Sequence, residues 1–213
     1  MSASVPPLAA RARAAADACK GFLDEAEGQR LYELAYEHAA LGPIVEVGSY
    51  CGKSSVYVGS GARSAGGTLV CVDHHRGNEE QQPGELYHDP DLMDAEAGAM
   101  DSLRFLRHTL RAAGLEDTAV LMVTTSRAAS ALCPGPFGMV FIDGGHTFEA
   151  AETDLACWAD KVAPGGILAI HDLFPDPAAG GQAPITIYRR ALASGRFDEL
   201  PTTRTLGVLR RKP

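Results

Sequence analysis

The chain has 213 residues, 46% of them hydrophobic, and a formal net charge of −8. This length fits one domain with enough chain to bury a core, and the negative charge argues against a nucleic-acid partner, because phosphate binding needs clustered Lys and Arg side chains. No apolar run approaches the roughly 18 residues of a membrane span, and five scattered cysteines indicate reduced thiols and a cytoplasmic location.

Residues 1–42 are predicted to form an N-terminal helical extension. The spacing of apolar residues favours helices near 8–20 and 27–40, and Gly42-Pro43 ends the second helix. A homodimer is expected. The two helices could form its interface, cover the active site, or do both.

Residues 43–213 are predicted to form a single α/β domain. Alternating strands and helices indicate a Rossmann-like, mostly parallel sheet with helices on both faces and an antiparallel C-terminal hairpin. The polar stretch 74–92 is too long for a routine connection, so we expect a lid-like loop there. Strands are expected at 44–48, 68–73, 119–124, 139–143 and 167–171, helices at 53–62, 93–113, 147–161 and 184–194, a short helix after 124, and the hairpin at 197–200 and 206–211.

The segment 44–55 combines a buried apolar run with a glycine turn that opens a helix. Such a turn lets a ligand approach the backbone and directs helix N-terminal amides at its negative groups. Only three residues separate Gly48 from Gly52, one fewer than a P-loop needs. Tyr50 occupies the place of the second glycine of a dinucleotide-binding turn. A purely structural strand-to-helix turn is the alternative to a cofactor site.

Polar residues follow all five predicted parallel strands. Ligands of an open parallel sheet bind beyond the carboxyl ends of the strands, so this convergence predicts a binding site. Asp73 could accept hydrogen bonds from ribose hydroxyls or cap a turn. Ser126 could contact an adenine or cap the next helix. The residues at the five strand ends are Glu46 with Gly48, Asp73, Ser126, Asp143 with His146, and His171 with Asp172.

Asp143 and Asp172 offer the hard oxygen ligands that suit Mg²⁺. His146 follows Asp143 by three residues, and a neutral imidazole beside the metal can act as a general base. A cation and a base together could activate a weakly acidic hydroxyl. His171 could be a third ligand, which would favour Mn²⁺ over Mg²⁺ to some degree, or it could hydrogen-bond a ligand or act as a second base. Three acidic side chains of the helix 147–161 are expected on its solvated face: Glu149, Glu152 and Asp154.

The glycine turn resembles the first motif of S-adenosylmethionine-dependent methyltransferases, in which an acidic residue stands two positions before a Gly-x-x-x-Gly turn. In detail it is similar to the Gly-x-Tyr-Cys-Gly-x-Ser turn of catechol O-methyltransferases. The resemblance implies the seven-stranded class I fold over roughly residues 40–212, with S-adenosylmethionine as cofactor. It also implies that Glu46 addresses the cofactor's ammonium group, directly or through water, and that Tyr50 and Ser54 line its methionine end.

The second half of the site resembles the metal-dependent sugar O-methyltransferases of macrolide and aminocoumarin biosynthesis and the related cephalosporin hydroxylase-like family. That resemblance implies a Mg²⁺-dependent O-methyltransferase acting on a carbohydrate hydroxyl, with His146 as base. The chain departs from the pattern at His171, where those families carry an acidic residue.

The His171-Asp172 pair and the small size are similar to mycobacterial enzymes that methylate a mannoside. The expected acceptor is therefore a mannoside or polysaccharide precursor. One alternative is a phenolic O-methyltransferase of the catechol or caffeoyl-CoA type, which has less need of His146. The other alternative is a non-catalytic cofactor-binding module.

Overall fold

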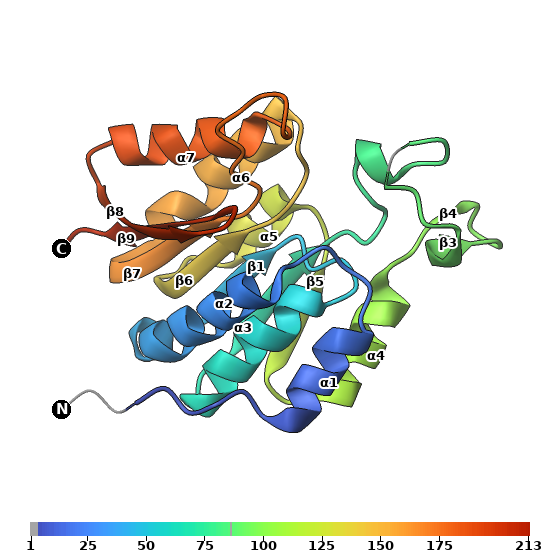
Figure 1. Ribbon diagram of the computed structural model, residues 1–213, viewed down its shortest axis with the longest axis horizontal. Coiled ribbons are helices and arrows are strands. Elements are labelled where there is room, and N and C mark those ends of the chain that lie inside the picture. The colour runs from blue at the N-terminus through green and yellow to red at the C-terminus, as the bar shows by residue number, and fades with distance from the viewer. Residues whose placement is uncertain (1–3, 86) are drawn as a thin grey trace.

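The computed structural model describes residues 4–85 and 87–213 and is built around one large sheet with helices on both faces (Figure 1). Its strands are β1 (Ile44–Val47), β2 (Leu69–Asp73), β5 (Ala119–Val123), β6 (Phe137–Ile142), β7 (Val162–Ile170), β8 (Phe197–Thr203) and β9 (Leu206–Arg211). The sheet has seven strands in the order β5-β2-β1-β6-β7-β9-β8. The first five are parallel to one another, and β9 pairs antiparallel with both β7 and β8. The predicted Rossmann-like sheet with an antiparallel C-terminal hairpin is confirmed.

Two groups of helices sandwich this sheet (Figure 1). One hydrophobic cluster joins the sheet to the first four helices, and a second joins it to the last three. Central strands such as β1 and β6 are buried at every position, as expected for parallel strands covered on both faces. The helices are α1 (Ala10–Ala18), α2 (Glu25–His38), α3 (Lys53–Ser64), α4 (Leu103–Ala113), α5 (Ser126–Leu132), α6 (Phe148–Trp158) and α7 (Ala183–Ala193). In the parts of the chain that are described, none of them is long and apolar enough to cross a membrane.

The N-terminal helices belong to the main core. Leu31 and Leu34 of α2 are buried in the same cluster as Ile44 of β1, and α1 packs against α3 and α4. Asp24 caps α2 by accepting a hydrogen bond from Ala26 N. The described part of the predicted extension, residues 4–42, is therefore continuous with the domain, and residues 1–3 of that prediction lie outside the described residues.

The helix predicted at 93–113 begins ten residues later than expected, at Leu103. Residues Met93–Asp94 and Ala99–Met100 instead pair as the short strands β3 and β4. Asp94 accepts hydrogen bonds from two backbone amides of the intervening turn, and Gly98 adopts a left-handed φ of +62°. A turn stabilised by a side-chain carboxylate thus outweighs the helix propensity of the Ala- and Glu-rich stretch.

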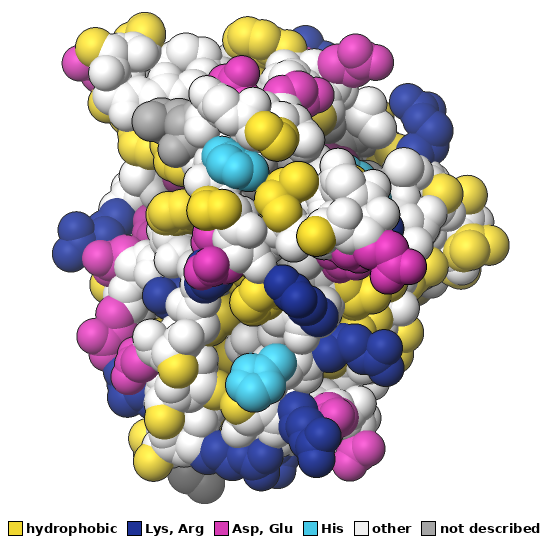
Figure 2. Space-filling view, turned by 90° about the vertical axis from the view of Figure 1, so that its right-hand side faces the viewer, with side chains coloured by type: hydrophobic (Ala, Val, Ile, Leu, Met, Phe, Trp, Pro, Cys, Tyr) yellow, Lys and Arg dark blue, Asp and Glu magenta, His cyan; other side chains and the backbone are white. Residues whose placement is uncertain are grey.

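Helix α4 itself is strongly amphipathic. Leu106 and Leu110 are buried, whereas Arg104, Arg107 and Arg111 are exposed. Figure 2 accordingly shows Lys and Arg side chains gathered toward the bottom of this face, where α1 and α4 lie. The apolar stripe explains why this segment is a surface helix packed on the sheet.

The predicted lid-like loop, residues 74–92, lies beyond the carboxyl ends of the strands (Figure 1). It contains two single turns of 3₁₀ helix, Glu79–Gln81 and Pro90–Leu92, and residue 86 within it lies outside the described residues. Ion pairs from Lys20, which follows α1, to Asp89 and Asp91 attach the loop to the N-terminal helices.

Candidate active site

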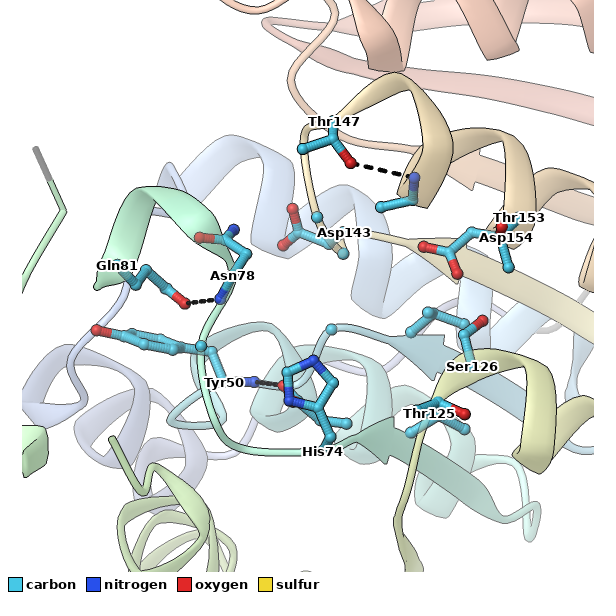
Figure 3. A pocket seen from close by; sticks show the side chains of 18 of the residues that line it. Tyr50, His74, Asn78, Gln81, Thr125, Ser126, Asp143, Thr147, Thr153 and Asp154 are labelled. Carbon is cyan, nitrogen blue, oxygen red and sulfur yellow. Dashed lines mark hydrogen bonds between the residues drawn. The ribbon is translucent and has the colours of Figure 1, made fainter. Parts of the chain in front are cut away.

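A cavity of about 720 Å³ opens at the carboxyl ends of β1, β2, β5 and β6. This volume is in the range of small-molecule and cofactor sites. Figure 3 shows Asp143 between the lid residues Asn78 and Gln81 on one side and Ser126 and Asp154 on the other. Five of the residues predicted from the sequence lie on the cavity wall: Gly48, Tyr50, Asp73, Ser126 and Asp143.

Gly48 joins the two halves of the site. Its φ of +92° is in the left-handed region that favours glycine, and a Cβ atom at this position would overlap the carbonyl oxygen of Asp143. The backbone of Asp143 is held in turn by a hydrogen bond from its N–H to Val47 O, 2.8 Å long. The turn after β1 and the end of β6 can therefore approach this closely only because residue 48 is glycine.

Asp73 ties together the turns that follow β1 and β2. Its carboxylate accepts one hydrogen bond from Tyr50 N, 2.8 Å long, and another from His75 N, 2.7 Å long. A carboxylate has about four acceptor positions, so Asp73 retains capacity for a ligand in the cavity. Tyr50 itself has a left-handed φ of +47°, and its ring extends toward Gln81 in Figure 3.

Ser126 lies on the cavity wall, and its neighbour Thr125 provides the N-cap of helix α5. Thr125 accepts the N-cap hydrogen bond of α5 from Ala128 N. The Ser126 hydroxyl instead accepts a 2.8 Å hydrogen bond from Trp158 Nε1. The structure thus separates the two roles that the sequence left open for Ser126: Thr125 is the cap, and Ser126 faces the cavity.

Asp154 was predicted on a solvated helix face, and this prediction is wrong. The side chain is buried on the cavity wall beside Ser126, and burial raises its pKa to about 6 although the Ser126 hydroxyl acts to lower it. The helical spacing held a signal for this position, because Asp154 falls on the buried stripe formed by Ala151, Leu155 and Trp158.

Glu46 and Ser54 lie behind the cavity wall. Glu46 is completely buried, and burial raises its pKa to about 7 even though the hydroxyls of Ser55 and Ser54 act to lower it. Glu46 Oε2 accepts a short hydrogen bond from Ser55. Within the described residues, Glu46 Oε1 and Ser49 Oγ are buried without a hydrogen-bond partner. Such orphaned acceptors are costly and mark a place where a ligand or water can bind.

Asp143, His146 and Asp172 form a compact cluster next to the cavity. Each offers one ligand atom, and these atoms lie within 4.8 Å of one another. Asp143 and His146 follow β6, and Asp172 follows β7 with a left-handed φ of +58°. Since β6 and β7 are adjacent and parallel, their ends bring these three side chains together. The residues are those that the sequence predicted to meet here.

His146 bridges this cluster and the lid. Its Nε2 lies 3.2 Å from Asp172 Oδ2, and its Nδ1 lies 3.1 Å from Glu80 Oε2. The hydrogen bond to Asp172, aided by Glu80 and opposed by burial, raises the pKa of His146 to about 9. Glu80 was not singled out by the sequence, since nothing distinguishes it from the other polar residues of the loop.

His171 lies beneath the cluster and is surrounded by carboxylates. Its Nδ1 is 3.2 Å from Asp143 Oδ1 and 3.3 Å from Asp172 Oδ1. Its Nε2 is 3.0 Å from Glu27 Oε2. Burial alone would lower the pKa of His171, but the three carboxylates raise it far above its usual value. The imidazolium therefore donates from both ring nitrogens and holds Asp143 and Asp172 side by side.

The sequence gives no sign that Glu27 belongs to this network. It is 2% exposed, and besides His171 it accepts hydrogen bonds from the N–H and the hydroxyl of Thr205, both 2.8 Å long. Burial would raise the pKa of Glu27, but the bonds from His171 and Thr205 lower it to about 2. Glu27 and His171 are 144 residues apart, and a helical Glu in a capping box gives no sign of such a contact.

Comparison with known proteins identifies this architecture. A family model described as a methyltransferase domain matches residues 45–173, which is more than half of the chain and runs from β1 past Asp172. The chain belongs to the methyltransferase domain family. The matched range contains the glycine turn, the cavity-wall residues and the metal-type cluster, whereas Glu27 lies outside it.

Solved structures share the whole fold of this methyltransferase domain at low sequence identity. Cofactor-bound Rv0187 from MTB is 20% identical, with 95% of this chain and 88% of that chain covered and a TM-score of 0.63. The O-methyltransferase TomG from Streptomyces achromogenes, in complex with SAM, is 17% identical over 99% and 92% of the two chains (TM-score 0.63). An O-methyltransferase from Bacillus cereus in complex with SAH is 15% identical over 99% and 94% (TM-score 0.64).

The first prediction concerns the ion pair between Glu27 and His171. Glu27→Gln keeps an acceptor for Thr205 but removes the only carboxylate that faces His171 Nε2 among the three around this imidazolium, so the free energy of unfolding should fall by about 3 kcal/mol at pH 7. Because the Glu27 pKa is lowered from 4.5 to about 2, its contribution is complete above pH 4.5 and is lost as the pH falls toward 2. Denaturant unfolding should therefore show a difference in the free energy of unfolding between the wild type and Glu27→Gln, and this difference should shrink as the pH is lowered. The exposed Glu37→Gln on the same helix is the control, with a change within about 0.5 kcal/mol.

The second prediction concerns Glu46. Its pKa is raised from 4.5 to about 7, so the folded state binds a proton that the unfolded state releases, and stability falls as the pH rises through this interval. Glu46→Gln removes this titration and should raise the free energy of unfolding at pH 8 by about 2 kcal/mol relative to the wild type, with no gain at pH 4. Thermal unfolding of both proteins without ligand, measured from pH 4 to 8, tests this. Parallel pH profiles would contradict it.

Proposed function

We propose that this protein is an S-adenosylmethionine-dependent O-methyltransferase that acts on a carbohydrate hydroxyl with the help of Mg²⁺. The observation that carries the proposal is the cluster of Asp143, His146 and Asp172, which adjoins the cofactor-sized cavity through Asp143. The solved structures of similar fold include O-methyltransferases bound to SAM or SAH, which supports the same cofactor and reaction here.

The cavity walls suit the parts of this cofactor. Asp73 retains acceptor capacity for ribose hydroxyls. Ser126 and Asp154 offer polar atoms for an adenine at the β5 side of the cavity. The orphaned Glu46 Oε1 and Ser49 Oγ lie behind the glycine turn, where they can accept from the cofactor's ammonium group through a bridging water. The turn amides after Gly48 can meet its carboxylate.

The donor set of the cluster fits a hard divalent cation. Asp143 and Asp172 would hold Mg²⁺, which typically binds one or two carboxylates and keeps several waters. Both nitrogens of His171 face carboxylates, so we assign it the role of holding the two ligands instead of the ligand role that the sequence left open. When bound, the cation supplies positive charge that lowers the pKa of an acceptor hydroxyl and of nearby His146.

His146 can act as a base only in its neutral form, which its pKa of about 9 makes the minor form at neutral pH without a bound cation. In that form Nε2, which lies 3.2 Å from Asp172 Oδ2, can receive the proton of the acceptor hydroxyl. Its other nitrogen, Nδ1, is oriented by Glu80 of the lid, so the position of the loop sets the direction of the imidazole. Asp172 stabilises the imidazolium that results. Methyl transfer is an in-line displacement, and the remaining work is alignment of the nucleophile by the cavity.

The presence of this base favours a sugar over a phenol. A sugar hydroxyl is a far weaker acid than a phenol and gains more from a base and a cation acting together. A phenolic acceptor remains the second candidate, because the turn Gly48-Ser-Tyr-Cys-Gly52 is similar to that of catechol O-methyltransferases.

The third prediction tests the reaction and the metal. Methyl transfer from labelled S-adenosylmethionine should occur on a simple O-methylated mannoside with Mg²⁺ and stop with EDTA. Asp143→Asn should lose activity at every Mg²⁺ concentration. Transfer to catechol alone would move the acceptor to the phenolic class. Cofactor binding by calorimetry without transfer to either acceptor would indicate a non-catalytic module, and activity of Asp143→Asn that EDTA still abolishes would place the metal elsewhere.

The fourth prediction tests His146 as base. His146→Gln should leave the dissociation constant of the cofactor nearly unchanged and lower kcat by at least about 10²-fold. His108→Gln, which changes an exposed histidine of α4, is the matched control and should have wild-type kcat. Wild-type turnover of His146→Gln would remove His146 from the reaction while leaving the cofactor assignment in place.

A further inference from the structure

Exposed apolar side chains gather at one edge of the sheet. Val120 and Val123 of β5 are 51% and 52% exposed, and Leu132 at the end of α5 is 75% exposed. The end of α5 lies against β5, since Cys133 Sγ is 3.5 Å from Met122 Sδ. Among the strands of the described chain, β5 pairs with β2 alone, so its other side is an open edge.

The two edges of the sheet differ in their protection. The opposite edge strand, β8, exposes Asp198 and Glu199, contains Pro201, and has an irregular register with β9. Charges, proline and irregular pairing are the features by which edge strands avoid pairing with other chains. The sequence of β5, Ala-Val-Leu-Met-Val, has none of them. Of the two edges of the seven-stranded sheet, the β5 edge is therefore the one suited to pairing with a strand of another chain.

The register with β2 determines which backbone groups of β5 point outward. Leu69 lies opposite Ala119, and Leu69 N donates to Thr118 O. In a parallel pair this places the N–H and C=O groups of residues 118, 120 and 122 toward β2. The groups that point to the open side therefore belong to the alternate residues, Ala119, Leu121 and Val123.

We propose that this edge is a dimer interface, occupied by β5 of a second copy of the chain in antiparallel orientation and centred on Leu121. In that register Leu121 pairs with Leu121 of the partner subunit, and Val123 pairs with Ala119 of the partner subunit. Every pair then joins two outward-facing residues, as a two-fold antiparallel ladder requires. The Ala119 N–H already donates to Leu115 O. Two bonds between the leucines and two from Val123 N–H to the partner's Ala119 carbonyl remain available.

Charges that flank the strand fit the same register. The exposed Glu116 and Asp117 precede β5, and the exposed Arg127, which also borders the cavity, lies in the first turn of α5 after it. Antiparallel pairing about Leu121 brings the acidic pair of one copy, at both ends of the ladder, to the end where β5 of the partner subunit leads into the first turn of α5, which carries Arg127. A parallel pairing of two copies would set acidic beside acidic residues. The flanking charges thus favour the antiparallel orientation, which the outward-facing backbone groups also allow.

Mass and amide exchange of the full chain test this ladder. Sedimentation equilibrium should give twice the 22.4 kDa of one chain at high concentration. Hydrogen exchange of the Leu121 and Val123 amides should slow at least tenfold as the protein goes from monomer to dimer. The amides of Val120 and Met122 face β2 and should be protected at every concentration, which makes them the internal control.

Two sets of variants test the residues and the register. Val120→Lys should raise the dimer dissociation constant at least tenfold, and Phe148→Lys, the same change at an exposed apolar residue of α6, should not. Glu116→Arg should weaken the dimer, and adding Arg127→Glu should restore it. A monomer at all concentrations would overturn the proposal. So would a dimer whose Leu121 and Val123 exchange does not change, or one that resists both Val120→Lys and the charge reversal.

Discussion

The buried imidazolium of His171 is the interaction on which the candidate active site depends. Three carboxylates, from Glu27, Asp143 and Asp172, converge on its two ring nitrogens. Three negative groups this close would repel one another in a low-dielectric site, and one positive group between them makes the arrangement tolerable. His171 thus offsets the cost of placing Asp143 and Asp172 side by side, and it contacts Oδ1 of each, while Asp172 Oδ2 lies 3.2 Å from His146 Nε2. An acidic residue at 171 would add another negative charge at the same place and would depend on the cation itself for compensation.

This network makes the N-terminal helices part of the site. Glu27 lies on α2. Its carboxylate contacts His171, which follows β7, and accepts a hydrogen bond from Thr205 in the turn between β8 and β9. Seven residues before Glu27, in the connection between α1 and α2, Lys20 binds Asp89 and Asp91 of the lid. Glu80 of the same loop contacts His146. The segment that contains Lys20 and Glu27 therefore contacts both the lid and, through His171, the proposed ligands Asp143 and Asp172. A movement of the lid would change the orientation of His146, the proposed base.

The sequence was sufficient where the controlling forces are local. Short, mostly apolar runs such as Ile44–Val47 predict strands directly. The residues that follow these strands could be placed at one edge of the sheet, because a parallel sheet allows few topologies. The predicted helix start at 93 is wrong, because the Asp94 carboxylate and Gly98 stabilise a turn there. This turn outweighs the weak helix propensity of the segment. Glu27 could not be found at all, since its role depends on a contact across 144 residues. Asp154 was predictable in principle, because its position on the buried stripe of α6 contradicts a solvated role.

The close approach at Gly48 explains why the glycine turn after β1 and the cluster of Asp143, His146 and Asp172 lie side by side. The absence of a side chain at residue 48 lets the carbonyl of Asp143 lie against the turn, so the strand end that carries Asp143 also forms the cavity wall. A larger residue at 48 would force the turn or the backbone at Asp143 to shift. In a displacement reaction the nucleophile and the methyl donor must lie within about 3–3.5 Å on one line. Under the proposed function, Gly48 would therefore set the distance between the methyl donor and Asp143, the proposed ligand of the cation that activates the acceptor.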